Sequence, residues 1–151
     1  MSTRDLVKNG LLIGGMLLVI LIVVVLVYFP PSGKLICTYS SAPGDPSAMF
    51  TYTADFNFWK VTKIESKEVV SSNSIEVLEE MKQAQEEALR EYEGEKYIYF
   101  SNKIKEKEFI SVSTIDYTKE DKKSLKKKGI DLSIRKLRNL YKNEGATCSY
   151  R

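Results

Sequence analysis

The two cysteines are the residues whose type and spacing point most directly to chemistry. Cys37 and Cys148 are the only cysteines of the 151-residue chain, and they lie near the two ends of its non-hydrophobic part. On the outer side of a membrane, such a pair indicates a disulfide that joins the first and last segments of one domain. Closing a loop of about 110 residues is worth on the order of 4–5 kcal/mol in a chain-entropy treatment. Two unrelated buried thiols are the alternative, and a metal site is not predicted because two cysteines fall short of four ligands.

A basic stretch near the C-terminus is the second candidate site. Between Lys119 and Lys142 there are ten Lys or Arg residues against three acidic ones. Each lysine near an anionic lipid surface contributes about 1 kcal/mol, so we predict contact with anionic lipid or a wall polymer. Nucleic acid is not expected, because the stretch lacks interleaved aromatic residues. The alternative is a solvated helix face that the acidic residues of 76–93 partly balance. The predicted contact residues are Lys122, Lys123, Lys126, Lys127, Lys128, Arg135 and Arg138.

Catalytic and cofactor chemistry find little support in the composition. The chain contains no histidine, which excludes Ser-His and Cys-His nucleophile pairs and imidazole zinc sites. It also has no phosphate-binding glycine-rich loop, no dinucleotide fingerprint and no EF-hand pattern. No spacing of carboxylates singles out a hydrolase. We therefore predict a non-enzymatic protein with no catalytic residue, no metal and no cofactor.

Residues 11–29 form an apolar run without a single charge. Nineteen helical residues at about 1.5 Å each approach the roughly 30 Å of a bilayer's hydrocarbon core. Tyr28 and Phe29 suit the membrane interface, and Pro30 and Pro31 would end the helix there. The run is longer than a typical cleavable signal, and Cys37 lacks the small preceding residues of a lipid-attachment site. We predict an uncleaved single-pass transmembrane helix, with cleavage as the alternative.

Charges around the apolar run set the expected orientation. Arg4 and Lys8 precede it against one acid, Asp5, and few charges follow it directly. The positive-inside rule then places the N-terminus in the cytoplasm and the C-terminal domain outside the cell membrane. The expected divisions are a cytoplasmic tail (1–10), an anchor (11–29), a linker (30–34) and an extracytoplasmic domain (35–151).

The domain is predicted to be α+β, with an antiparallel sheet of four or five strands and helices packed on one face. The clearest strand is 50–58, where Phe50, Tyr52, Ala54, Phe56 and Phe58 alternate with polar residues and predict an aromatic core face. A short strand over 34–40 precedes it. Further strands are expected over 61–71, 96–103 and 108–117, paired as two hairpins.

Three helical segments are expected beside this sheet. The first begins at Asn73-Ser74, with Glu76 at the third helical position, and ends at Gly94. Its outer face is acidic. The second begins with Thr118 as its cap and ends at Gly129. The third follows an apolar stripe that Gly145 terminates, and its members are Ile130, Ile134, Leu137 and Tyr141.

The order of these features resembles the YehR-type small bacterial lipoproteins, a family of unknown function. The similar motifs are 60–63, Tyr92-Glu93-Gly94, 112–117 leading into 122–129, and the closing helix 137–145. The resemblance spans about 90 residues and implies an extracytoplasmic α+β domain. It brings no ligand or catalytic residue with it. The long anchor and the missing lipid-attachment cysteine depart from the pattern.

Two functions follow from this organisation. We expect a single-pass, membrane-anchored extracytoplasmic accessory or binding domain, with possible protein partners at the cell surface. The alternative is a structural subunit of a cell-surface assembly, such as a pilin-like or secretion-complex component. Against this alternative, 11–22 contains no acid, and Pro30-Pro31 would end the helix instead of continuing it into the domain.

Overall fold

The computed structural model describes residues 19–28 and 30–151, and the chain divides into a unit up to Pro31 and a unit from Ser32 onward. In the first unit, residues 19–28 are helical and the side chains from Val19 to Val27 are 45–69% exposed. The predicted tail (1–10) and residues 11–18 and 29 of the predicted anchor lie outside the described residues. Within the part of the chain that is described, no helix has the length and apolarity that a membrane crossing requires.

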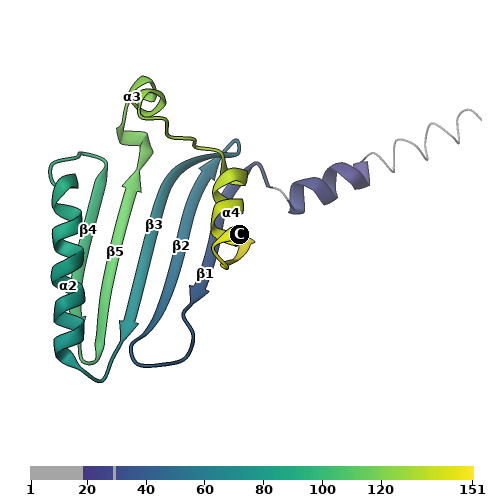
Figure 1. Ribbon diagram of the computed structural model, residues 1–151. Helices are drawn as coiled ribbons and strands as arrows, with labels where there is room; N and C mark the ends of the chain where they lie inside the picture. Colours follow the sequence, from purple (N-terminus) through teal and green to yellow (C-terminus); the bar gives the residue numbers. More distant parts are fainter. Residues whose placement is uncertain (1–18, 29) are drawn as a thin grey trace, which may run out of the picture. The chain divides into compact units, whose positions relative to one another are not determined.

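The second unit is built on one six-stranded antiparallel sheet (Figure 1). The strands run in the order β4-β5-β3-β2-β1-β6. The prediction of four or five strands was low by at least one, because β6 has only four residues and so shows no readable alternation. The strands are β1 (Ser32–Ser40), β2 (Ser47–Asn57), β3 (Lys60–Ser71), β4 (Ile98–Lys105), β5 (Glu108–Asp116) and β6 (Thr147–Tyr150).

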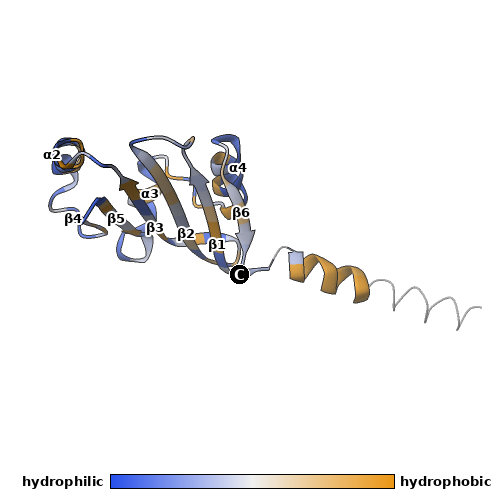
Figure 2. Cartoon of the chain, turned by 90° about the horizontal axis from the view of Figure 1, so that it is seen from below, coloured by the Kyte–Doolittle hydropathy of each residue, from blue (hydrophilic) through white to orange (hydrophobic). Residues whose placement is uncertain are grey.

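Two longer helices, α2 (Ile75–Leu89) and α4 (Ile134–Asn143), cover the same face of the sheet (Figure 2). The predicted α+β architecture with helices on one face is therefore confirmed. Short α3 (Lys122–Lys127) and the 3-10 turns η1 (Arg90–Tyr92) and η2 (Tyr117–Lys119) complete the domain. Ser74 caps α2 by accepting a hydrogen bond from the Val77 amide, so Glu76 is the second helical residue and not the third.

The β-ladder register places the core on the helix-covered face. Opposite residues of an antiparallel pair share a face, so Leu35, Ala54 and Ile64 lie side by side in one row. The larger core lies beneath α4, where Ile134 packs against that row. A smaller core under α2 contains Val70, Leu78 and Phe109. Fully burying one such side chain contributes about 1.5–3 kcal/mol. The buried residues of the larger core are Leu35, Cys37, Ala54, Phe56, Val61, Ile134, Tyr141 and Ala146.

The predicted aromatic face of β2 is correct up to Phe56 and wrong at Phe58. Ala54 and Phe56 are buried, whereas the Phe58 side chain is 74% exposed. The reason is the ladder: Asn57 pairs with Lys60, so the strand ends and Phe58 belongs to a two-residue turn. Strand β1 begins at Ser32, inside the stretch expected to be a linker.

Candidate functional site

The predicted disulfide is present between Cys37 and Cys148. The two residues are direct partners in the ladder between β1 and β6, so the bond crosses the edge of the sheet. Cys37 is fully buried beneath α4. The bond joins the first and last strands of the domain and encloses 111 residues, which assigns it a structural role.

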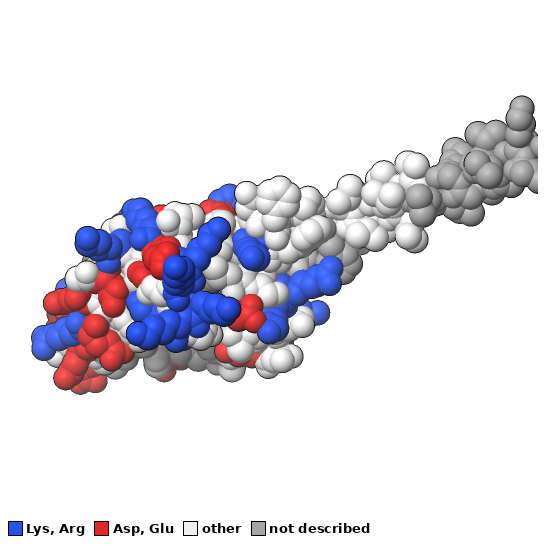
Figure 3. All heavy atoms as spheres, turned by 90° about the horizontal axis from the view of Figure 1, so that it is seen from above, with Lys and Arg blue, Asp and Glu red and all other residues white. Residues whose placement is uncertain are grey.

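The basic stretch begins at Lys119 in η2 and continues into α3, a helix of six residues. Asp121 caps it by accepting hydrogen bonds from the Lys123 and Ser124 amides, so the predicted cap at Thr118 is wrong. Thr118 instead belongs to η2, where its hydroxyl and amide both donate to Asp116. Leu125 is the buried residue of α3. The four lysines at 122, 123, 126 and 127 are all exposed, and Figure 3 shows Lys and Arg side chains gathered over this end of the domain.

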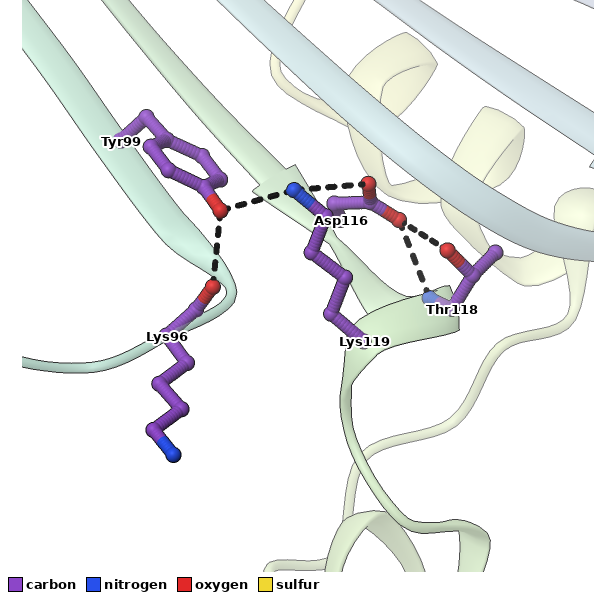
Figure 4. Close-up of polar contacts among 5 residues, drawn as sticks. All are labelled: Lys96, Tyr99, Asp116, Thr118 and Lys119. Atoms are coloured by element: carbon purple, nitrogen blue, oxygen red, sulfur yellow. Dashed lines mark hydrogen bonds and ion pairs between the residues drawn. The ribbon is translucent and has the colours of Figure 1, made fainter.

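Lys119, at the start of the stretch, is held by neighbouring polar groups (Figure 4). Its ammonium donates to the Tyr99 hydroxyl at 2.8 Å and lies 3.9 Å from Asp116. The hydrogen bond to Tyr99 is the main reason that the pKa of Lys119 is raised. Hydrogen bonds from Thr118 lower the pKa of Asp116. This contact network fixes where β5 leaves the sheet.

The structure separates the other predicted contact residues into different surroundings. Lys128 donates to the Tyr97 hydroxyl at 2.9 Å, with its ammonium 4.8 Å from the centre of that ring. Arg138, on α4, lies with its guanidinium carbon 5.2 Å from the Tyr150 ring centre. Arg135 is also on α4 and makes interactions of its own. The seven predicted residues therefore differ in their contacts, and their role in binding an anionic surface stays a prediction.

The turn between β2 and β3 lies next to α3 and consists of two aromatic residues. Phe58 and Trp59 have φ angles of 47° and 59°, the left-handed region that a type I′ hairpin turn requires. Large side chains are true outliers in this region, where Asn and Gly are preferred. Both rings face outward, and Trp59 is 44% exposed. A hairpin connection was predicted between residues 58 and 61, but Phe58 was assigned to the strand and the exposed aromatic pair was not recognised, although Trp59 is the only tryptophan of the chain.

Backbone hydrogen bonds hold the turn firmly in place. The Trp59 carbonyl accepts from the Ile134 amide at 3.0 Å, and the Val61 amide donates to the Leu132 carbonyl at 2.7 Å. On the other side, the Phe58 amide donates to the Ser32 hydroxyl at 3.4 Å. Ser32 is the first residue of the sheet, so the aromatic turn lies at the end of the domain where the chain arrives from the apolar segment.

A pocket of about 660 Å³, open to solvent, lies between the aromatic turn and α3. Three cationic side chains border it: Lys60 from β3, and Lys122 and Lys126 from α3. Its one acidic group, Asp131, is ion-paired with Lys136, whose hydrogen bond lowers the pKa of that carboxyl. We call this surface the joining end, and define it as Phe58, Trp59, Lys60, Lys122, Lys126 and the neighbouring lysines 123 and 127.

The joining end combines aromatic rings with positive charge, a combination that is typical of surfaces at a membrane interface, where rings enter the headgroup layer and lysines contact anionic headgroups. Within residues 19–28 and 30–151, no cluster of three or more His, Cys, Asp or Glu side chains is placed to hold a metal ion.

Comparison of the chain with protein-family models, with curated proteins and with solved structures gives no match.

Proposed function

We propose that this chain is a single-pass membrane protein whose C-terminal domain lies outside the cell as a non-enzymatic accessory or binding domain. In this proposal the joining end rests on anionic headgroups of the membrane that anchors the chain. The domain is thereby held in one orientation and presents its opposite end and its helix-covered face to other molecules. The α+β architecture agrees with what the YehR-type resemblance implies, and we include that relation in the proposal.

The observation that carries the proposal is the aromatic turn. Phe58 and Trp59 occupy left-handed positions that cost roughly 1–2 kcal/mol per residue relative to glycine or asparagine. Strained residues persist where function requires them. Their exposed rings contribute nothing to the core, and they lie beside three lysines at the end where the anchor joins. Lipid contact accounts for both the residue types and their location.

The disulfide supports the extracytoplasmic location, because such bonds persist in oxidising compartments. The exposed apolar side chains of residues 19–28 support the anchor, since they leave an apolar helix surface that lipid would cover.

Sidedness is tested on intact cells with a membrane-impermeant maleimide, with and without prior reduction. We expect the partly exposed Cys148 to be labelled on intact cells, and only after reduction, whereas the buried Cys37 reacts only if reduction loosens the domain. Labelling that requires lysis but no reductant would place the domain in the cytoplasm and overturn the proposal. The size of the protein extracted from native membranes tests the alternative of an assembly subunit, because that alternative predicts a large co-purifying complex.

Lipid contact is tested by amide hydrogen exchange on the full-length chain in phosphatidylcholine nanodiscs, with and without phosphatidylglycerol. We expect slower exchange in 57–61 and 122–133 when the anionic lipid is present. The turn between β4 and β5, at the opposite end of the sheet, is the internal control. Equal exchange in both lipids at the joining end would contradict the proposed contact.

A further inference from the structure

The helix-covered face of the sheet contains a belt of polar residues between its two cores. The ladder places Phe50, Glu68, Ser111 and Asn102 side by side across four strands. The next row toward the joining end contains Tyr52, Ser66 and Ser113, followed by Phe100 on β4. The rows on either side of this belt are apolar, for example Val70 with Phe109 below it and Ile64 with Ile115 above it.

This belt is costly for the fold. A polar group that faces a core is destabilising unless it is hydrogen-bonded. Both amide atoms of Asn102 are buried, and neither has a hydrogen-bond partner among the described residues. Ser111 is only 2% exposed. Serine, glutamate and asparagine at the centre of a covered sheet face are therefore poorly explained by stability alone.

The part of the belt on β2, β3 and β5 forms the floor of two hollows between α2 and α4, the two helices that flank the middle strands in Figures 1 and 2. Asn102 and Phe100, on β4, line neither hollow. One hollow, of about 260 Å³, is lined by the rings of Tyr39, Phe50 and Tyr52 together with Glu144 and Ala146. The other is about 130 Å³. They share Phe50 and Tyr52 as lining residues, so they adjoin, and we call them together the central groove. The smaller hollow is lined by Phe50, Tyr52, Ser66, Lys67, Glu68, Gln85, Ser111 and Ser113.

The walls of the groove are aromatic. Tyr39 and Phe50 lie with ring centres 6.0 Å apart at an angle of 40°, and Tyr39 is 40% exposed. Tyr52 is stacked at 4.2 Å on Tyr141 of α4, which fixes its position. Exposed ring faces of this kind accept the C–H faces of a flat, partly apolar ligand.

The floor is rich in groups that both donate and accept hydrogen bonds. Three serine hydroxyls and the Gln85 amide each offer a donor and an acceptor. The two acidic groups at the groove, Glu68 and Glu144, disfavour an anion. Lys67 borders the smaller hollow, but strand alternation directs its exposed side chain to the opposite face.

A cationic ligand is the less favoured alternative. Glu68 makes a hydrogen bond with Gln85, yet burial raises the pKa of its carboxyl and so favours the uncharged form. A hydroxyl-rich ligand uses the serines, the amide and either form of the carboxyl equally well. The size of the hollows suits one or two rings of such a ligand.

We propose that the central groove binds a short stretch of an uncharged saccharide. Sugar rings stack on Tyr39 and Phe50, while their hydroxyls exchange hydrogen bonds with Ser66, Ser113 and Gln85. Held above the membrane by its anchor, a domain with this groove would contact the glycan of the cell envelope.

The test measures binding of three neutral oligosaccharides (chitotetraose, cellotetraose and maltotetraose) by calorimetry and NMR shifts. It uses the full-length chain in phosphatidylcholine nanodiscs. We expect at least one to bind with a dissociation constant below about 10 mM. Gln85→Leu and Ser113→Val, tested separately, should each weaken binding about tenfold or more, since each leaves a ligand hydroxyl unpaired.

The matched controls are Gln83→Leu, on the exposed face of the same helix, and Ser101→Val, on the outward face of β4, and both should bind as the parent does. The proposal would be overturned if none of the three saccharides binds, or if binding survives both groove variants. Tetralysine serves as the probe for the cationic alternative, and the proposal would also be overturned if it alone binds and the groove variants abolish that binding. Because the nanodiscs lack anionic lipid, these results are independent of the proposed lipid contact.

Discussion

The two tight turns at opposite ends of the sheet both place residues in the left-handed region, two at the β2–β3 turn and one at the β4–β5 turn, and they do so with different chemistry. The β2–β3 turn uses Phe58 and Trp59, both with positive φ, and the β4–β5 turn uses Glu106, with φ of 55°, followed by Lys107. At the second turn the side chains are polar, and the Lys107 ammonium donates to Asn73 at 3.1 Å. At the first, two large rings face outward.

In the proposed function, this difference marks the end of the domain that contacts the membrane. A polar residue in a left-handed turn costs little and needs no further reason, since its side chain is solvated. Two exposed aromatic residues in the same conformation oppose both the local preference and the tendency of rings to be buried. Only the aromatic turn lies at the end where the apolar segment joins, beside Lys122 and Lys126. The proposed lipid contact accounts for this choice of residues, which folding alone does not favour.

The largest expected effect is on stability and comes from removing the disulfide. The two turns lie at opposite ends of one sheet, and their comparison requires that this sheet stays folded. Cys37→Ala/Cys148→Ala should lower the free energy of unfolding by about 4 kcal/mol, because 111 enclosed residues regain freedom in the unfolded chain. Denaturant titration measures this, and reducing the parent protein should reproduce it. A loss below about 1 kcal/mol would mean that the sheet edge is stable without the bond.

The second-largest effect is expected when the two aromatic residues of the β2–β3 turn are replaced. Phe58→Asn/Trp59→Gly supplies the preferred type I′ residues, so the melting temperature should rise while lipid contact weakens by about 3 kcal/mol. Calorimetry and hydrogen exchange in anionic nanodiscs measure the two changes. Glu106→Asn/Lys107→Gly is the matched control, and it should leave lipid contact unchanged. If the joining end exchanges amide hydrogen equally slowly in both turn variants, the aromatic residues are not responsible for lipid contact.

Charge should have a smaller effect. Lys122→Gln/Lys126→Gln should weaken contact with anionic lipid by about 2 kcal/mol, and added salt should reduce the difference between variant and parent. Lys103→Gln/Lys105→Gln removes the same charge from β4 near the opposite end. Blue shift of the Trp59 emission against phosphatidylglycerol content reports the contact. Equal effects of the two double variants would show that net charge matters and location does not.

The smallest effect is at the polar turn. Glu106→Gly should raise the free energy of unfolding by about 0.5–1 kcal/mol, because glycine adopts positive φ without steric cost and this gain exceeds its extra unfolded-state entropy. Thermal unfolding measures the change, with lipid contact unaffected. A destabilised Glu106→Gly variant would show that the Glu106 side chain, and not only the backbone, matters at this turn.

Elements with a strong local pattern could be predicted from the sequence. Alternation over 50–58 predicted β2, and the spacing of Ser74 and Leu78 placed the start of α2 within a residue or two. The predicted end at Gly94 was too late, because α2 ends at Leu89 and the 3-10 turn η1 follows it. The disulfide could be predicted because the chain has only two cysteines, so only one pairing within the chain is possible. Strand β6 was missed because four residues carry no periodicity, and only their pairing with β1 defines them.

The candidate sites were less predictable, because they depend on where strands end and what lies opposite. Phe58 continues the period-two pattern of β2, so only the hydrogen-bond ladder shows that it leaves the strand. The basic stretch looks uniform in sequence, yet Lys128 turns toward Tyr97 while Lys122 and Lys126 border the cavity. The polar belt did leave a signal in the sequence. Every second residue of β5 faces the core, and in this series Ser111 and Ser113 stand between the apolar Phe109 and Ile115.

The most direct test of the central claim uses the single tryptophan of the chain. With the full-length protein in vesicles that contain phosphatidylglycerol, brominated lipids should quench Trp59 emission, most strongly when bromine lies near the headgroups. Lys122→Gln/Lys126→Gln should reduce that quenching, and Lys103→Gln/Lys105→Gln should not. Emission that brominated lipid leaves unchanged while aqueous acrylamide quenches it fully would show that the joining end does not touch the membrane.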